Sequence, residues 1–152
     1  MSRPSWQEYF MKLAHEVATR GTCVKRQVGA IIVRDNRILT TGYNGPPSKT
    51  AHCEEGKCYR IVNNSPSGTD LDKCRAIHAE QNAIIQAALH GVSTIDSAIY
   101  TTHQPCLTCA KMIINAGIRQ IYYAQHYPDP LALEMLDEAG VSYQQILIDT
   151  KV

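Results

Sequence analysis

Four side chains in two short motifs could hold a metal ion and use it chemically. The motifs are His-Ala-Glu at residues 78–80 and Pro-Cys-Leu-Thr-Cys at residues 105–109. One imidazole and two thiolates form a ligand set that suits zinc, and three protein ligands leave a fourth position for water, as catalytic zinc sites require. We therefore expect His78, Cys106 and Cys109 to bind zinc. Glu80 is close enough in the sequence to reach that water without being a ligand.

Both motifs fall where the sequence predicts the first turn of a helix. Helix N-termini carry free N–H groups and partial positive charge, which lower the pKa of a nearby thiol. The i, i+3 spacing of Cys106 and Cys109 puts both sulfurs on one helix face. If the two helix starts lie side by side on a sheet, the three ligands converge.

The same residues also fit two other kinds of site. A Cys-x-x-Cys pair where a strand meets a helix describes a thioredoxin-like redox site. A structural zinc site is the second alternative, with Glu80 as a fourth ligand. The His-x-Glu motif on a separate helix start favours the catalytic zinc site, because a redox dithiol does not need it.

Helix and strand patterns alternate along the chain. The expected helices cover about 5–19, 76–89, 105–116 and 130–139. The expected strands cover 28–33, 37–41, 97–102, 120–124 and 143–148. This alternation predicts an α/β domain of three layers, with a mixed central sheet of about five strands flanked by helices. We expect one domain over residues 1–152.

Three of these segments carry more specific expectations. Asp35-Asn36 is a turn signal, so the strands on either side should form a hairpin. The helix that begins at Ala76 is expected to bury Ile77, Ile84, Ile85 and Ala88. Residues 46–73 are polar and loop-like, and a loop this long in a compact domain is usually functional or tied by a metal.

The composition is that of a globular protein with little net charge. Apolar residues make up 44% and charged residues 19% of the 152 residues, and the formal net charge is +1, which argues against a broad surface for long nucleic acid. The start, MSRPSWQEYF, lacks the apolar centre of a signal peptide, and no apolar run is long enough for a membrane span. We therefore expect a cytoplasmic protein whose six cysteines serve metal binding or catalysis.

The chain resembles the cytidine and deoxycytidylate deaminase superfamily, and within it the deoxycytidylate (dCMP) deaminase branch, from about Trp6 to Val141. His-x-Glu followed by Pro-Cys-x-x-Cys is the signature of zinc-dependent nucleobase deaminases. The other blocks are Val-Gly-Ala-Ile-Ile-Val at 28–33 and Gly-Tyr-Asn-Gly at 42–45. This second block, followed by a long cysteine-bearing insert, is similar to the dCMP branch.

The resemblance implies hydrolytic deamination of dCMP to dUMP and ammonia. Zinc would activate the water, and Glu80 would deliver the water proton to the ring nitrogen and would then protonate the departing amine. The branch also implies a homo-oligomer, often a hexamer, and regulation by dCTP (activation) and dTTP (inhibition), with Mg²⁺ on the triphosphate. The alternatives are a deaminase of another cytosine, guanine or tRNA-adenosine substrate, and a non-catalytic binding protein, which the intact Glu80 disfavours.

The resemblance also assigns substrate contacts. Asn44 matches an asparagine that binds the substrate's sugar, although a turn residue is the alternative. The amide of Ala79 and the backbone near Thr102 would read the base edge. A monophosphate needs a cationic or N–H-rich partner. Arg26 is the first choice, and the further candidates are Lys25, His126 and Tyr127.

Four cysteines remain: Cys23, Cys53, Cys58 and Cys74. The resemblance implies a second, structural zinc in some members, with ligands at positions like Cys23 and Cys53. Relatives supply a histidine pair as the other ligands, but this chain has no histidine between Cys53 and His78. Cys58 and Cys74 could substitute and so hold the insert; four reduced thiols are the alternative.

Overall fold

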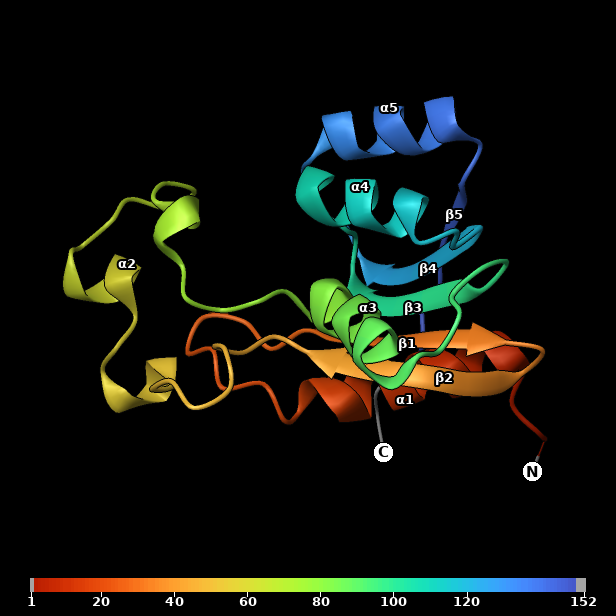
Figure 1. Ribbon diagram of the computed structural model, residues 1–152, viewed down its shortest axis with the longest axis horizontal. Helices are drawn as coiled ribbons and strands as arrows, with labels where there is room; N and C mark the ends of the chain where they lie inside the picture. The colour runs from red at the N-terminus through yellow and green to blue at the C-terminus, as the bar shows by residue number, and fades with distance from the viewer. Residues whose placement is uncertain (1, 150–152) are drawn as a thin grey trace.

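A mixed five-stranded sheet forms the centre of the computed structural model, which describes residues 2–149 (Figure 1). The strands are β1 (Gly29–Arg34), β2 (Arg37–Tyr43), β3 (Ala98–His103), β4 (Gln120–Gln125) and β5 (Ser142–Gln145), in the order β2-β1-β3-β4-β5. Strand β1 is antiparallel to β2 and β3, whereas β4 is parallel to β3 and β5. The predicted mixed sheet is therefore confirmed.

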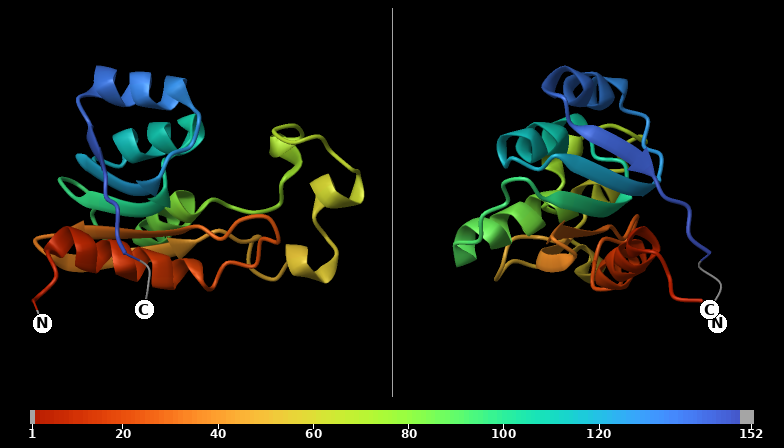
Figure 2. Two further views of the ribbon diagram at one scale, coloured as in Figure 1. Left: turned by 180° about the vertical axis from the view of Figure 1, so that it is seen from behind. Right: turned by 90° about the vertical axis from the view of Figure 1, so that its right-hand side faces the viewer.

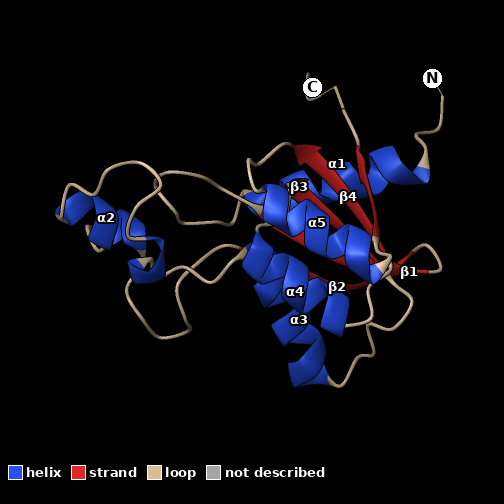
Figure 3. Ribbon diagram, turned by 90° about the horizontal axis from the view of Figure 1, so that it is seen from above, coloured by secondary structure: helices blue, strands red, loops and turns tan. Residues whose placement is uncertain are grey.

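Four longer helices cover the two faces of this sheet. They are α1 (Trp6–Ala18), α3 (Ala79–His90), α4 (Leu107–Asn115) and α5 (Pro130–Ala139). Helix α1 lies on one face (Figure 2), and the other three lie side by side on the opposite face (Figure 3). The prediction of a three-layer α/β architecture is confirmed. None of the helices in residues 2–149 is long and apolar enough to cross a bilayer.

Alternating side chains of β1 build a separate core on each face. Ala30 and Ile32 pack in the core beneath α3, α4 and α5, whereas Ile31 and Val33 pack against α1. This is the two-residue period of a strand that is covered on both sides. The expected hairpin is also present, since Asp35 and Asn36 both have positive φ, 52° and 57°, as a type I′ turn requires.

Helix α3 differs from its prediction in where it begins and which face it buries. It begins at Ala79 and not at Ala76, because Ile77 pairs with Gly45 in an isolated bridge and His78 becomes the N-cap. The buried positions are Ala79, Glu80, Ala83 and Ala87, while Ile85 and Ala88 are exposed and Ile77 and Ile84 are only partly buried.

The cause of this difference is the close contact between α3 and β2. A Cβ atom added to Gly42 of β2 would lie 2.2 Å from the backbone oxygen of Ala79 and 2.4 Å from the nitrogen of Ala83. Only alanine-sized side chains fit at such a separation. Ile85 and Leu89 are therefore exposed, and Ile84 is only partly buried against the core.

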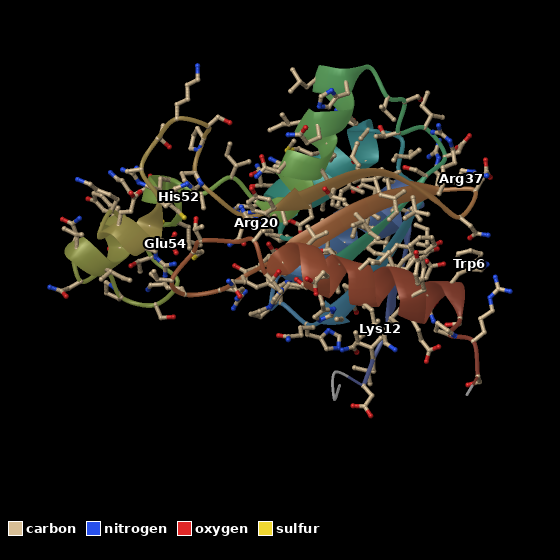
Figure 4. The ribbon with its side chains drawn as sticks, turned by 90° about the horizontal axis from the view of Figure 1, so that it is seen from below. Trp6, Lys12, Arg20, Arg37, His52 and Glu54 are labelled. Atoms are coloured by element: carbon tan, nitrogen blue, oxygen red, sulfur yellow. The ribbon has the colours of Figure 1, made fainter. Side chains whose placement is uncertain are left out.

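Residues 46–76, here called the arm, extend away from the sheet (Figure 1). The arm contains three short helical turns: η1 (Cys53–Glu55), α2 (Tyr59–Val62) and η2 (Leu71–Lys73). Figure 4 shows His52 and Glu54 on the arm and Arg20 where the chain leaves α1 towards it. The predicted long loop is thus present, but it is partly ordered into turns.

We expect Gly42→Ala to lower the free energy of unfolding by about 1–3 kcal/mol, because the new methyl group meets backbone atoms that cannot move aside. Equilibrium urea unfolding measures this loss. Gly45→Ala is a matched control, since its Cβ would meet only the Tyr43 ring at 3.8 Å. Equal stability of the two variants would contradict the close packing of α3 on β2.

Candidate metal centre

Two helix starts meet at the edge of the sheet where β3 ends. His78 is the N-cap of α3 and Cys106 is the N-cap of α4, so both motifs occupy helix N-termini as the sequence predicts. The bridge between Gly45 and Ile77 holds the start of α3 beside the end of β2. The turn from β3 into α4 delivers Cys106 and Cys109 to the same place.

The three predicted ligand atoms converge. His78 Nδ1 lies 3.2 Å from Cys109 Sγ and 3.5 Å from Cys106 Sγ. A tetrahedral zinc ion with ordinary bond lengths would hold a nitrogen and a sulfur ligand about 3.5 Å apart. Among residues 2–149 these three form the one group of at least three His, Cys, Asp or Glu side chains whose ligand atoms all lie within 4.8 Å of one another. The donor set and its spacing therefore fit zinc.

Glu80 lies directly beside this group and is almost completely buried, with 4% of its surface exposed. The Thr101 hydroxyl donates a hydrogen bond of 3.0 Å to Oε1, and the Cys109 sulfur lies 3.5 Å from Oε2. Burial raises the pKa of the Glu80 carboxyl, so it takes up a proton more readily than an exposed glutamate. One carboxylate oxygen is thus held by Thr101, and the other faces the ligand group.

Protons and a cation compete for the same sites in this centre. A hydrogen bond from the Cys109 thiol lowers the pKa of Cys106 to about 4. The same hydrogen bond, with burial, raises the pKa of Cys109, and the interaction with Cys106 raises the pKa of His78. At neutral pH the thiol pair therefore keeps one proton, which a divalent cation must displace to bind both sulfurs.

The sequence reasoning missed three residues that position these groups. Gln81 Oε1 accepts the backbone N–H of His78 at 2.8 Å, which its place three residues after the N-cap could have indicated. Thr101 holds Glu80, as described above. Asp129 Oδ2 accepts the backbone N–H of Leu107 at 2.8 Å, a contact between distant segments that no local pattern reveals.

Asn44 is buried, and its side-chain amide organises the chain between β2 and β1. Its Oδ1 accepts the N–H of Val28 at 2.8 Å, and its Nδ2 donates to the Arg26 carbonyl at 2.8 Å. The amide therefore ties the end of β2 to the segment that leads into β1. Each amide atom makes one of its two hydrogen bonds in this way.

The residues predicted to contact the base edge and the phosphate occupy neighbouring segments. The Arg26 guanidinium lies over the Tyr127 ring, 5.7 Å from its centroid, while Lys25 and His126 are exposed. Ala79 is completely buried as the first residue of α3, and Thr102 Oγ1 accepts the Gly29 N–H at 3.2 Å. The structure thus pairs Arg26 with Tyr127.

The four remaining cysteines gather around Cys53, and none of them is in a disulfide. Burial is the main cause that raises the pKa of the Cys53 thiol to about 11, and the other three thiols raise it further through their electrostatic interaction with it. Cys53 and Cys58 are buried, and Cys23 and Cys74 are partly buried.

Comparison with known proteins gives a consistent result. Residues 4–125 match the protein family described as the cytidine and deoxycytidylate deaminase zinc-binding region. "ComE operon protein 2" of Bacillus subtilis is 44% identical over 154 residues, which cover 100% of this chain and 77% of that protein. The deoxycytidylate deaminase of Schizosaccharomyces pombe is 40% identical over 146 residues, covering 95% of this chain but 45% of its own length.

A solved structure extends the likeness to three dimensions. The dCMP deaminase from the cyanophage S-TIM5, in complex with dCMP and dUMP, superposes with a TM-score of 0.80 at 31% sequence identity. The match covers 96% of this chain and 100% of that chain.

We expect zinc to bind this centre more weakly as the pH falls. The raised pKa values of His78 and Cys109 mean that both keep their protons to higher pH than free side chains, so protons compete with the ion. The affinity at about pH 6 should be on the order of tenfold or more below that at about pH 8, measured by competition with a chromophoric chelator.

Cys109→Ser should remove this tight site at both pH values, whereas Cys58→Ser, a thiol outside the centre, should leave it intact. A pH-independent affinity, or a number of tightly bound zinc ions that Cys109→Ser leaves unchanged, would show that these three side chains are not the ligands.

Proposed function

Because this chain belongs to the cytidine and deoxycytidylate deaminase family, we propose that it removes the amine of dCMP by hydrolysis, giving dUMP and ammonia. The observation that carries the proposal is the convergence of His78, Cys106 and Cys109 beside the buried Glu80 carboxyl. The likeness to the cyanophage enzyme bound to dCMP and dUMP supports the choice of substrate.

In this proposal His78, Cys106 and Cys109 hold the metal, and Glu80 moves the protons. Zinc, when bound there, would lower the pKa of water at its open position enough to give a nucleophile near neutral pH. Glu80 takes the proton of the attacking water and delivers it to the ring nitrogen beside the reacting carbon. It then takes the proton of the newly added hydroxyl and gives it to the departing amine, which leaves as ammonia. Burial suits Glu80 to this work, because the raised pKa brings its protonated and ionised forms closer in energy.

The two oxygens of the Glu80 carboxyl have different roles in this proposal. The hydrogen bond from Thr101 fixes Oε1, so that Oε2 is left facing the reacting groups. Thr101 is completely buried, and its neighbours in β1 and β4 hold it in register. In the proposed reaction, Thr101 orients the proton carrier but does not itself touch the substrate.

Substrate contacts are proposed for four further places. Asn44 can still offer one N–H and one lone pair to a sugar hydroxyl, since each amide atom makes one other hydrogen bond. The amide of Ala79 and the backbone near Thr102 would read the base edge. Arg26 is exposed and would bind the phosphate, and the contact of its guanidinium with the Tyr127 ring supports this by limiting where the guanidinium can go.

The purified protein should release ammonia from dCMP, and Glu80→Gln should lower that turnover by at least about a hundredfold, because the amide cannot carry the proton. The same variant should keep its zinc, since Glu80 is not among the ligands. Ammonia release and zinc content are measured on the same preparations.

A panel of dCMP, CMP, deoxycytidine, cytosine and guanine defines the substrate, with and without dCTP plus Mg²⁺. Preference for dCMP over deoxycytidine would measure the part of recognition that the phosphate supplies. Ammonia release from guanine and not from dCMP would overturn the proposal that dCMP is the substrate. Normal turnover by Glu80→Gln would remove Glu80 from the mechanism.

Control by dCTP and dTTP, assembly into a homo-oligomer such as a hexamer and a cytoplasmic location stay predictions of the family resemblance. The dCTP arm of the panel tests the first of these.

We also propose a second, structural zinc held by Cys23, Cys53, Cys58 and Cys74. Three thiols that interact electrostatically with the buried Cys53 support this, because cysteines brought together bind zinc as thiolates. The ion would anchor the arm to the segment that follows α1, since Cys23 lies on that segment and the other three lie in the arm.

The wild-type chain should therefore contain about two zinc ions, and Cys109→Ser and Cys53→Ser about one each. Elemental analysis of gel-filtered protein gives the count. One ion per wild-type chain would eliminate the second site and leave four reduced thiols.

A further inference from the structure

Asp129 caps the starts of two helices with one carboxylate. Its Oδ1 accepts the N–H of Ala132 at 3.2 Å and so caps its own helix α5. Its Oδ2 reaches across to α4 and accepts the N–H of Leu107 at 2.8 Å. The Ala132 N–H is shared with the Asp129 carbonyl at 3.2 Å, whereas the Leu107 N–H lies in a first turn that offers it no partner within α4. The carboxylate therefore joins α5 to α4 where α4 begins.

The Leu107 amide is the group through which this contact reaches the metal centre. Leu107 is the first residue of α4 and follows Cys106 directly. The peptide unit that joins them is planar, so fixing its N–H also fixes the Cα atom of Cys106. Cys109 is completely buried in the core, whereas Cys106 is only partly buried. Of the two sulfur ligands, Cys106 has the greater need of support from outside the core.

The chain around Asp129 is built to present the carboxylate in one place. Asp129 lies between Pro128 and Pro130, and Pro130 is the first residue of α5. The proline that follows disfavours a helical backbone at Asp129, whose φ is −131° and ψ 83°, and the N–H of Asp129 donates to the Tyr127 carbonyl at 2.8 Å. A carboxylate on such a restricted loop loses little conformational entropy when it makes both hydrogen bonds.

We infer that Asp129 is a positioning residue for the metal ligand Cys106, acting through the N–H of Leu107. It makes α5, which lies beyond the family-matched residues 4–125, part of the support of the metal centre. The inference rests on the proposal that His78, Cys106 and Cys109 hold zinc. Outer partners of this kind usually change metal affinity without contacting the ion.

Asp129→Ser is the sharpest test. Serine is as good an N-cap as aspartate, so α5 keeps its cap, but one short hydroxyl cannot also reach Leu107. The ion of the metal centre is the one that Cys106→Ser no longer binds. We expect this ion to dissociate from Asp129→Ser roughly ten to a hundred times faster than from the wild type. The melting temperature of Asp129→Ser should stay close to that of the wild type. Release is followed with a chromophoric chelator on the full chain.

Two more variants separate positioning from general stability. Asp129→Ala should release the ion at least as fast as Asp129→Ser and also lose the cap of α5. Ser5→Ala removes the cap of α1, where Ser5 Oγ accepts the Glu8 N–H at 3.2 Å, and should release zinc at the wild-type rate. Cobalt-substituted Asp129→Ser should show altered absorption bands, because the Cys106 sulfur is held less firmly.

The possible results are distinct. Wild-type release from both Asp129 variants would overturn this inference and leave the proposed function intact. If Asp129→Ala does not fold, Asp129→Ser alone decides, since it keeps the cap. If the wild type binds no more zinc than Cys106→Ser does, the proposed metal centre itself would be overturned.

Discussion

The close contact of α3 with β2 is the constraint on which the metal centre depends. At Gly42 the two backbones approach so closely that even one Cβ atom would collide with α3. This contact sets the height of α3 above the sheet and therefore the position of its first residues. His78 and Glu80 lie at that end of α3, so their distance from the turn after β3 follows from backbone packing. The site is consequently as rigid as the sandwich that carries it.

The chemistry of the centre follows from placing several acidic groups together in a buried space. Glu80, Cys106 and Cys109 each gain negative charge when they lose a proton, and they share one corner of the fold with a single imidazole. Protons balance this charge in part, as the raised pKa values of Glu80 and Cys109 show. A divalent cation would balance it more completely and would free Glu80 to exchange protons. Metal binding and proton transfer therefore rest on the same arrangement.

The sequence predicts most of the fold and the ligand group, because both depend on local patterns. The alternation of helices and strands, the Asp35-Asn36 turn and the Cys-x-x-Cys spacing are each set by a few neighbouring residues. The buried face of α3 could not be read in this way, since it is decided by a glycine on a distant strand. Ile85 is exposed because alanines fit against Gly42, although its hydrophobicity alone favours burial. Thr101 and Asp129 escaped prediction for the same reason, as their partners lie far away along the chain.

The bridge between Gly45 and Ile77 closes the arm at its base. Two backbone hydrogen bonds, of 3.2 Å and 2.7 Å, join these residues, and His78 follows immediately. Once the ends of a loop are held together, doubling its length costs only about 0.6 kcal/mol of additional closure entropy. Insertions and deletions within the arm should therefore cost the domain little stability, provided that they leave the bridge between Gly45 and Ile77 intact. The fold can accordingly accommodate arms of different length and chemistry next to an unaltered metal centre.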